Sequence, residues 1–178
     1  IGLSCHVDYF TVRKNNLGKS FCTQRQASYN RQIGKGPRYT PQLVVNGQVE
    51  LIGYETAKVS AAVMKARAAK TPRVGITATG ADTFDVNLPQ VSAGNDPMQL
   101  WLAVYDAPKS MAMTEGNNFG KKLTYVNVVS QMKDLGAWDG AAGPRPVQVA
   151  FDADDAGVAV FAQNMRTGKI MAAGSAAR

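Results

Sequence analysis

The sequence predicts an α+β protein of two parts. Residues 1–70 combine short apolar runs with helix-like segments, which indicates mixed strands and helices. Residues 73–178 contain short β-type runs separated by Gly, Asn, Asp and Pro, a rhythm typical of an all-β, sandwich-like domain. Thr71-Pro72 stands between the two parts and marks the expected boundary, because the residue before a proline disfavours the helical backbone.

The charge distribution supports the same division. Residues 1–73 contain twelve Lys/Arg and three acids, a net charge of +9, whereas residues 74–178 carry a net charge of −2. This asymmetry favours two units and gives the first one a positive field. We interpret that field as a solvated basic face rather than a nucleic-acid surface, because no aromatic-plus-basic RNA motif, zinc-finger spacing or basic helix accompanies it.

Five helices and strands, and one loop, are expected in the first part. Thr23 suits the position that caps a helix start, and Asn46-Gly47 between two apolar runs is a strong signal for a two-residue hairpin turn. Val59, Val63 and Ala66 fall on one face of the second helix and predict that this face is buried. The elements are a buried strand at 1–7, a loop at 15–19, a helix at 23–33, strands at 42–45 and 48–52, and a helix at 55–69.

Seven short strands are expected in the second part, at residues 74–79, 83–88, 100–105, 123–130, 147–151, 158–162 and 169–173. The ambiguous stretch is 123–135. Its β-branched and aromatic residues favour a strand, although Val128, Met132 and Leu135 also have helical spacing. We predict a strand there.

Thr40-Pro41 directly precedes an apolar strand, and a hairpin and a helix follow it. An ordinary trans proline at a strand start is one explanation. The whole order, however, resembles the cis-proline half of thioredoxin-fold proteins, so we expect a cis Thr40–Pro41 bond. In that fold the proline loop lies beside the redox cysteines, and its backbone can pair with an extended substrate.

Motifs along nearly the whole chain extend this resemblance. In the first part they are His6-Val7-Asp8-Tyr9-Phe10, Arg25-Gln26, Tyr29, Tyr39-Thr40-Pro41-Gln42 and Val44-Val45-Asn46-Gly47. In the second part they are Gly116, Asn118, Gly120, Leu123-Thr124-Tyr125, Asn127-Val128-Val129, Leu135-Gly136, Trp138, Gln163 and Gly168. Together they resemble a family of uncharacterised, mostly bacterial and usually exported thioredoxin-like proteins, known as a domain of unknown function.

The resemblance implies an incomplete thioredoxin-like domain over residues 1–70 and a periplasmic or secreted protein. The family usually begins with a strand and a Cys-x-x-Cys-Pro turn opening a helix, and nothing in this sequence corresponds to them. Phe10 replaces a usual Trp, and Glu115 and Asn117 replace a usual Arg and Glu, which puts a salt-linked role for that loop in doubt. Because Ile1 already lies in an expected strand, we interpret the start as a processed or truncated end, with any export signal upstream.

The candidate substrate-binding residues are Thr40, Pro41, His6, Asp8 and Tyr9. His6 and Asp8 are two residues apart in an expected strand, so both could face one site as an acid–base pair, tune a thiol or bind a metal. We favour a structural histidine and a turn-forming aspartate, because no nucleophile is nearby. We expect no metal and no cofactor.

Cys5 and Cys22 are the two cysteines, and their spacing matches no metal or redox motif. Cys5 lies in an apolar stretch, where a free cysteine is often a small core residue. We favour that interpretation over a Cys5–Cys22 disulfide, which requires export.

Two functions remain open. The first is a binding or structural module whose incomplete sheet is completed by a protein partner or an upstream segment. The alternative is a thiol–disulfide oxidoreductase whose Cys-x-x-Cys lies in a missing upstream segment. We favour the module, because these 178 residues hold no pair of catalytic nucleophiles. No nucleic-acid partner is expected, and no run of about 20 apolar residues predicts a membrane span.

Overall fold

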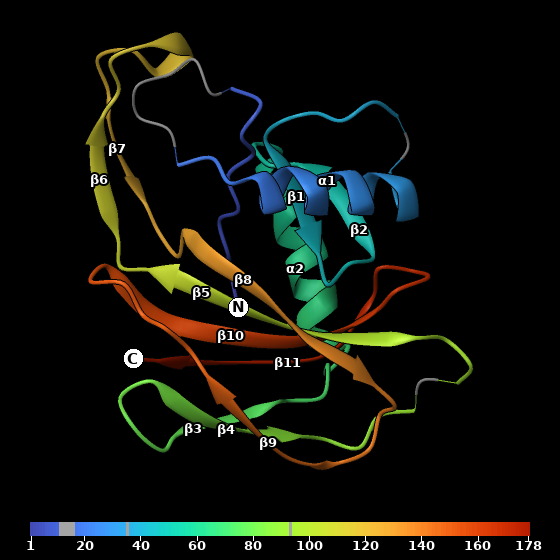
Figure 1. Cartoon of the computed structure of the whole chain (residues 1–178). Coiled ribbons are helices and arrows are strands. Elements are labelled where there is room, and N and C mark those ends of the chain that lie inside the picture. The colour runs from blue at the N-terminus through green and yellow to red at the C-terminus, as the bar shows by residue number, and fades with distance from the viewer. Residues whose placement is uncertain (11–16, 35, 93) are drawn as a thin grey trace.

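The computed structural model describes residues 1–10, 17–34, 36–92 and 94–178 (Figure 1). In these ranges the chain is mostly antiparallel β, with eleven strands, two α-helices and one 3-10 turn. The helices are α1 (Ser20–Gln32) and α2 (Thr56–Ala68), and the 3-10 turn is η1 (Gly116–Asn118). The strands are β1 (Gln42–Val45), β2 (Val49–Ile52), β3 (Gly75–Ala78), β4 (Thr83–Leu88), β5 (Met98–Asp106), β6 (Lys109–Ala112), β7 (Lys122–Tyr125), β8 (Val129–Trp138), β9 (Gly143–Gln148), β10 (Asp155–Asn164) and β11 (Ile170–Ala177).

The predicted fold class, α+β with an incomplete thioredoxin-like domain, is wrong. Residues 1–7 form no strand, because only Ser4 makes a β-bridge, and its parallel partner is Val128. Strands β1 and β2 form a two-stranded sheet by themselves. The elements of residues 1–70 therefore share no common sheet, and antiparallel strands from residue 75 onward dominate the structure.

Two larger sheets enclose the main hydrophobic core. One has the strand order β11-β10-β5-β8 and the other β3-β4-β9, with antiparallel pairing throughout. Alternate residues of β4 point inward, as the buried Phe84, Val86 and Leu88 show. They pack against Val158 and Val160 of β10 in one cluster of buried residues.

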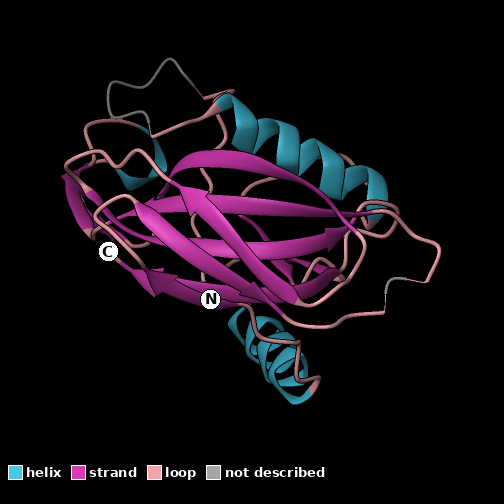
Figure 2. Ribbon diagram, turned by 60° about the horizontal axis from the view of Figure 1, so that its bottom comes forward, coloured by secondary structure: helices cyan, strands magenta, loops and turns pink. Residues whose placement is uncertain are grey.

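The opposite face of the four-stranded sheet carries a second, smaller cluster. Its buried members are Ala103, Val129 and Phe161, and Leu3 and Phe21 from the start of the chain pack against them. The four-stranded sheet is thus apolar on both faces, which explains why nearly every residue of β10 is buried. Figure 2 shows the two helices lying outside the layered strands.

Local predictions succeeded better than the fold class. The strand at 42–45 is confirmed as β1, and the strand interpretation of 123–135 is confirmed by β7 and β8. Helix α1 begins at Ser20, three residues before the predicted Thr23, whose hydroxyl bonds to Asp8 instead. The hairpin turn has three residues rather than two, because Val45 pairs with Val49. The predicted loop at 15–19 begins on residues 15–16, which lie outside the described ranges.

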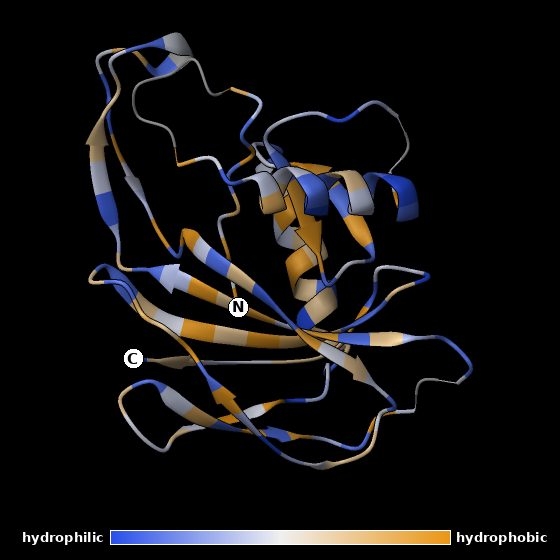
Figure 3. Cartoon of the chain, viewed as in Figure 1, coloured by the Kyte–Doolittle hydropathy of each residue, from blue (hydrophilic) through white to orange (hydrophobic). Residues whose placement is uncertain are grey.

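The predicted position of the second helix is confirmed by α2, but the predicted burial of one of its faces is wrong. None of its residues is fully buried, and Val63 is 39% exposed. The reason is that, among the described elements, only the β1–β2 hairpin contacts it substantially. Figure 3 shows β1 and α2 as the more apolar elements beside a polar α1.

The boundary at Thr71-Pro72 stays a prediction. Across it, the backbone carbonyl of Pro72 accepts a hydrogen bond from Ala173 (3.1 Å), and that of Asn46 accepts one from Ile170 (2.9 Å). These contacts attach the hairpin turn of the first part and the boundary itself to β11.

Candidate functional site

A cavity of about 1240 Å³ lies beside the β1–β2 hairpin. Its walls come from residues 1–7, α1, β1, the connection between β6 and β7 with Tyr125 of β7, and the outer face of the four-stranded sheet. Of the five predicted substrate-binding residues, Thr40, Pro41 and His6 line this cavity, whereas Asp8 and Tyr9 do not. The structure therefore brings three of them to one site.

A buried glutamine of α1 holds the Thr40–Pro41 loop in place by a hydrogen bond to its backbone. The predicted cis bond at Thr40–Pro41 is confirmed. Gln26 of α1, only 7% exposed, donates from Nε2 to the backbone carbonyl of Tyr39 (2.8 Å). Its Oε1 accepts a hydrogen bond from the Tyr9 hydroxyl (3.0 Å). Tyr9 thus fixes the helix residue that fixes the loop, and its ring also contacts Phe10, which lines the cavity.

Strand β1 presents a free edge to the cavity. In the described part of the chain its sheet contains β2 as the second and last strand, and residues 41–44 line the cavity. Gly53 donates to the carbonyl of Pro41 (2.8 Å), so Pro41 points its backbone groups toward β2. Because backbone groups alternate along an antiparallel strand, those of Gln42 and Val44 point away from β2.

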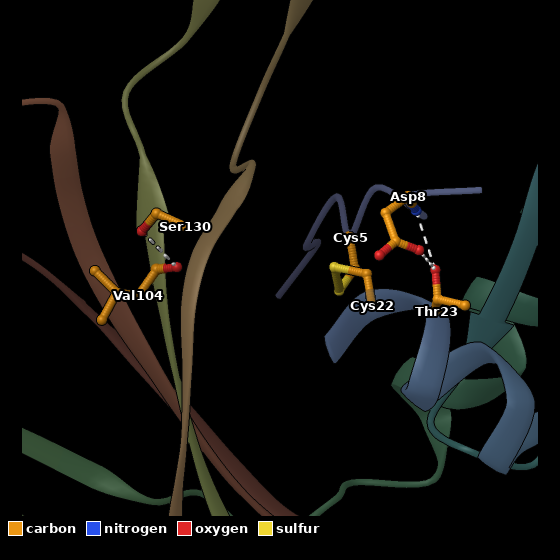
Figure 4. The surroundings of a disulfide bond; sticks show 6 residues. All are labelled: Cys5, Asp8, Cys22, Thr23, Val104 and Ser130. Atoms are coloured by element: carbon orange, nitrogen blue, oxygen red, sulfur yellow. Dashed lines mark hydrogen bonds between the residues drawn. A yellow bond between two sulfur atoms is a disulfide. The ribbon is translucent and has the colours of Figure 1, made fainter. Parts of the chain in front are cut away.

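The acid–base pair considered for His6 and Asp8 does not form. The His6 and Tyr125 rings pack in a T-shaped arrangement with centroids 5.1 Å apart, and burial lowers the pKa of the imidazole. Asp8 turns to α1, where Oδ1 accepts from the Thr23 hydroxyl at 2.5 Å (Figure 4). The same-side rule for residues two apart fails, because this segment is not a strand.

Cys5 and Cys22 form a disulfide in the cavity wall, so the prediction of a free Cys5 is wrong (Figure 4). Cys22 is 2% exposed, whereas Cys5 is an exposed residue. Disulfides persist in oxidising compartments, so this bond fits an exported protein. Among the described helices, none has the length and apolar character that crossing a membrane requires.

The contacts of Arg25 attach α1 to the four-stranded sheet. The Arg25 guanidinium donates from Nη2 to the Tyr29 hydroxyl (2.9 Å) and to Oε1 of Gln163 (3.1 Å). Gln163, 5% exposed, donates from Nε2 to the carbonyl of Gly168 (2.9 Å). Three aromatic rings lie within 5.1–5.4 Å of the Arg25 guanidinium carbon: Tyr29, Trp101 and Phe161. Cation–π contacts and hydrogen bonds together hold the helix on the sheet.

Comparison with known proteins assigns the chain to a family. Residues 1–163 match the family described as "Protein of unknown function (DUF1223)". The chain belongs to the DUF1223 family. A crystal structure of an Agrobacterium tumefaciens protein, determined in a structural genomics programme, is similar with a TM-score of 0.75 and 24% identity. The match covers 99% of this chain and 79% of that one, and it shows the shared fold alone. No curated protein matches.

In this DUF1223 protein, sequence reasoning missed that Arg25 and Gln163 are neighbours. Both stood among the family-like motifs, but 138 residues separate them and a single sequence gives no sign of their contact. Covariation between the two positions in related sequences is the signal that would find it. Within the described ranges, no three His, Cys, Asp or Glu side chains gather closely enough to hold a metal ion.

Proposed function

We propose that this DUF1223 protein is a binding module that takes an extended segment of a partner polypeptide along the free edge of β1. The observation that carries the proposal is the position of that edge. Among the described residues, β1 has a strand partner on one side only, and its residues 42–44 form part of the wall of the 1240 Å³ cavity. Unpaired backbone groups of an edge strand readily add another strand.

The size and the walls of the cavity suit a polypeptide. Pockets for small ligands have volumes of about 300–1,000 Å³, which is less than this one. Four residues of strand rise about 13 Å, a length over which an extended segment gains several backbone hydrogen bonds. Apolar side chains of the sheet, among them Met132, Phe161 and Ile170, line the cavity and provide a surface for side chains of the bound segment.

In this proposal the five candidate residues have two roles. Thr40, Pro41 and His6 contact the bound segment, because they line the cavity. Asp8 and Tyr9 support them through α1, by their bonds to Thr23 and Gln26. We also infer that the protein works in the periplasm or outside the cell, which the disulfide supports.

The test uses peptides selected from a displayed heptapeptide library on the whole chain, with affinities measured by fluorescence anisotropy. Val44→Pro removes the N–H that points from β1 into the cavity, and we expect at least tenfold weaker binding. Ile52→Pro is the matched control: it pairs with Gln42 across the same hairpin, so its N–H points away from β1 on the opposite edge. Equal binding by both variants, or failure to select any peptide, would refute the proposal.

A further inference from the structure

The Cys5–Cys22 disulfide is placed for attack from the cavity. Both cysteines line it, and they differ strongly in access, since Cys5 is exposed and Cys22 is 2% exposed. A thiol entering the cavity therefore reaches the sulfur of Cys5 more readily. The cysteine left behind in such an attack is Cys22.

Cys22 occupies a position that stabilises a departing thiolate. It is the third residue of α1, whose first turn contains no acidic residue and whose N-cap, Lys19, makes no side-chain capping bond. The positive end of the helix dipole favours negative charge at this place and opposes the effect of the Asp8 carboxylate, which accepts a hydrogen bond from the neighbouring Thr23. Arg25, one turn further along, lines the same cavity and adds positive charge.

We propose that Cys5–Cys22 is a redox-active disulfide that accepts two electrons from a dithiol. A thiolate of the dithiol attacks Sγ of Cys5, the Cys5–Cys22 bond breaks, and Cys22 leaves as a thiolate that takes a proton from water. The second thiol of the dithiol loses its proton and attacks the donor sulfur of the mixed disulfide. Cys5 is then released and protonated. The dithiol becomes a disulfide and the protein holds two thiols, so two electrons and two protons have been transferred.

The fold does not depend on this disulfide alone, which separates a redox role from a purely structural one. The N-terminal segment is also held by Ser4, which donates to the carbonyl of Asn127 and accepts from the N–H of Val129, both at 2.9 Å. The carbonyl of His6 accepts from Lys19 (2.9 Å). Reduction therefore leaves several contacts in place, and the reduced protein remains folded. This inference does not rest on polypeptide binding.

The first experiment measures reduction of the native protein. The whole chain is incubated with dithiothreitol at neutral pH without denaturant, and thiols are alkylated and counted by intact mass. We expect two alkylated cysteines while the tryptophan fluorescence and the cooperative thermal transition persist. The measurement is repeated with a reduced dithiol protein as the donor. Faster reduction by this protein than by dithiothreitol indicates a macromolecular donor, and slower reduction indicates a small one. Reduction only at denaturant concentrations that unfold the protein would overturn the proposal.

Two pairs of variants test the direction of attack. With Cys22→Ala, the remaining Cys5 should form a mixed disulfide with oxidised glutathione at least tenfold faster than Cys22 does in Cys5→Ala. Ser20→Asp places a negative charge on the first residue of α1 and should slow reduction about two- to fivefold. Ser28→Asp, two turns along the same helix, is its control and should leave the rate unchanged. Faster reaction of Cys22, or equal rates in the two aspartate variants, would overturn the assigned roles.

Discussion

Replacing Gln163 with alanine tests how strongly α1 is held on the four-stranded sheet. The change removes the acceptor for Arg25 (3.1 Å) and the donor to Gly168 (2.9 Å). A hydrogen bond to a charged group is worth about 1.5–3 kcal/mol and a neutral one about 0.5–1.5 kcal/mol. Because Gln163 is 5% exposed, water cannot easily replace either bond. We expect the free energy of unfolding to fall by about 2–4 kcal/mol.

Urea denaturation followed by tryptophan fluorescence measures this loss, and Trp101 beside Arg25 makes the signal sensitive to the contact. Gln99→Ala is the matched control, since this glutamine lies on β5 of the same sheet and its amide pairs with Asp134 at an exposed position. Gln99→Ala should lower the free energy of unfolding by less than about 1 kcal/mol. Gln163→Glu keeps the acceptor for Arg25 and loses the donor to Gly168, so it should fall between the two. A Gln163→Ala protein as stable as Gln99→Ala would refute the reasoning.

Gly47→Ala should lower the free energy of unfolding by more than about 1 kcal/mol, because φ is +64° and a Cβ would lie 1.8 Å from the carbonyl oxygen of Gly168. Gly120→Ala is the control in the same denaturation assay. At φ +78° and with open space around it, this residue shows the backbone cost alone. Burial lowers the pKa of His6, so the unfolded chain binds its proton more readily and stability should decline as pH falls through about 6.5. Unfolding curves between pH 5 and 8 should show this slope reduced in His6→Gln, and an unchanged slope would contradict the assignment. The Arg166 hydrogen bond lowers the pKa of Asp96 to about 2. Ionised Asp96 therefore stabilises the folded protein at pH values above its ordinary pKa of 3.8, and this stabilisation is lost as pH falls through about 2. An NMR titration of the Asp96 carboxyl checks this value, and Arg166→Gln should raise it.

Local chemistry was predictable where the determining residues are close in sequence. Asn46-Gly47 located the hairpin, and the β-branched residues around Val128 correctly favoured a strand over a helix. The pattern of α2 showed which side could be buried, but it could not show whether anything covers that side. Val63 is exposed because its helix has only the hairpin as a substantial neighbour.

The candidate site was predictable in part for the same reason. Thr40 and Pro41 came from a local motif, and they do line the cavity. The opposite walls come from the β6–β7 connection, β7, β8 and β10, over 60 residues further along the chain, and only the sheet topology brings them there. The disulfide was missed because its spacing carries no signal. Bonds from Asp8 to Thr23 and from Tyr9 to Gln26 fold the segment back on α1, and these contacts bring Cys5 close to Cys22.

The bridge between Ser4 and Val128 constrains the order of events during synthesis. Val128 follows Ser4 by 124 residues, so at 5–20 residues per second the ribosome needs about 6–25 s to supply the partner. In that interval Leu3 cannot yet pack against the cluster that contains Val129, the residue after Val128. Cys5 and Cys22 have both been made already. Once the chain reaches an oxidising compartment, the Cys5–Cys22 link can hold residues 1–10 near α1 before β8 is in place. A chain that cannot make this link holds residues 1–10 to α1 by hydrogen bonds such as those of Asp8 and Tyr9 until β8 is in place, which leaves them more open to proteases and to other unfolded chains.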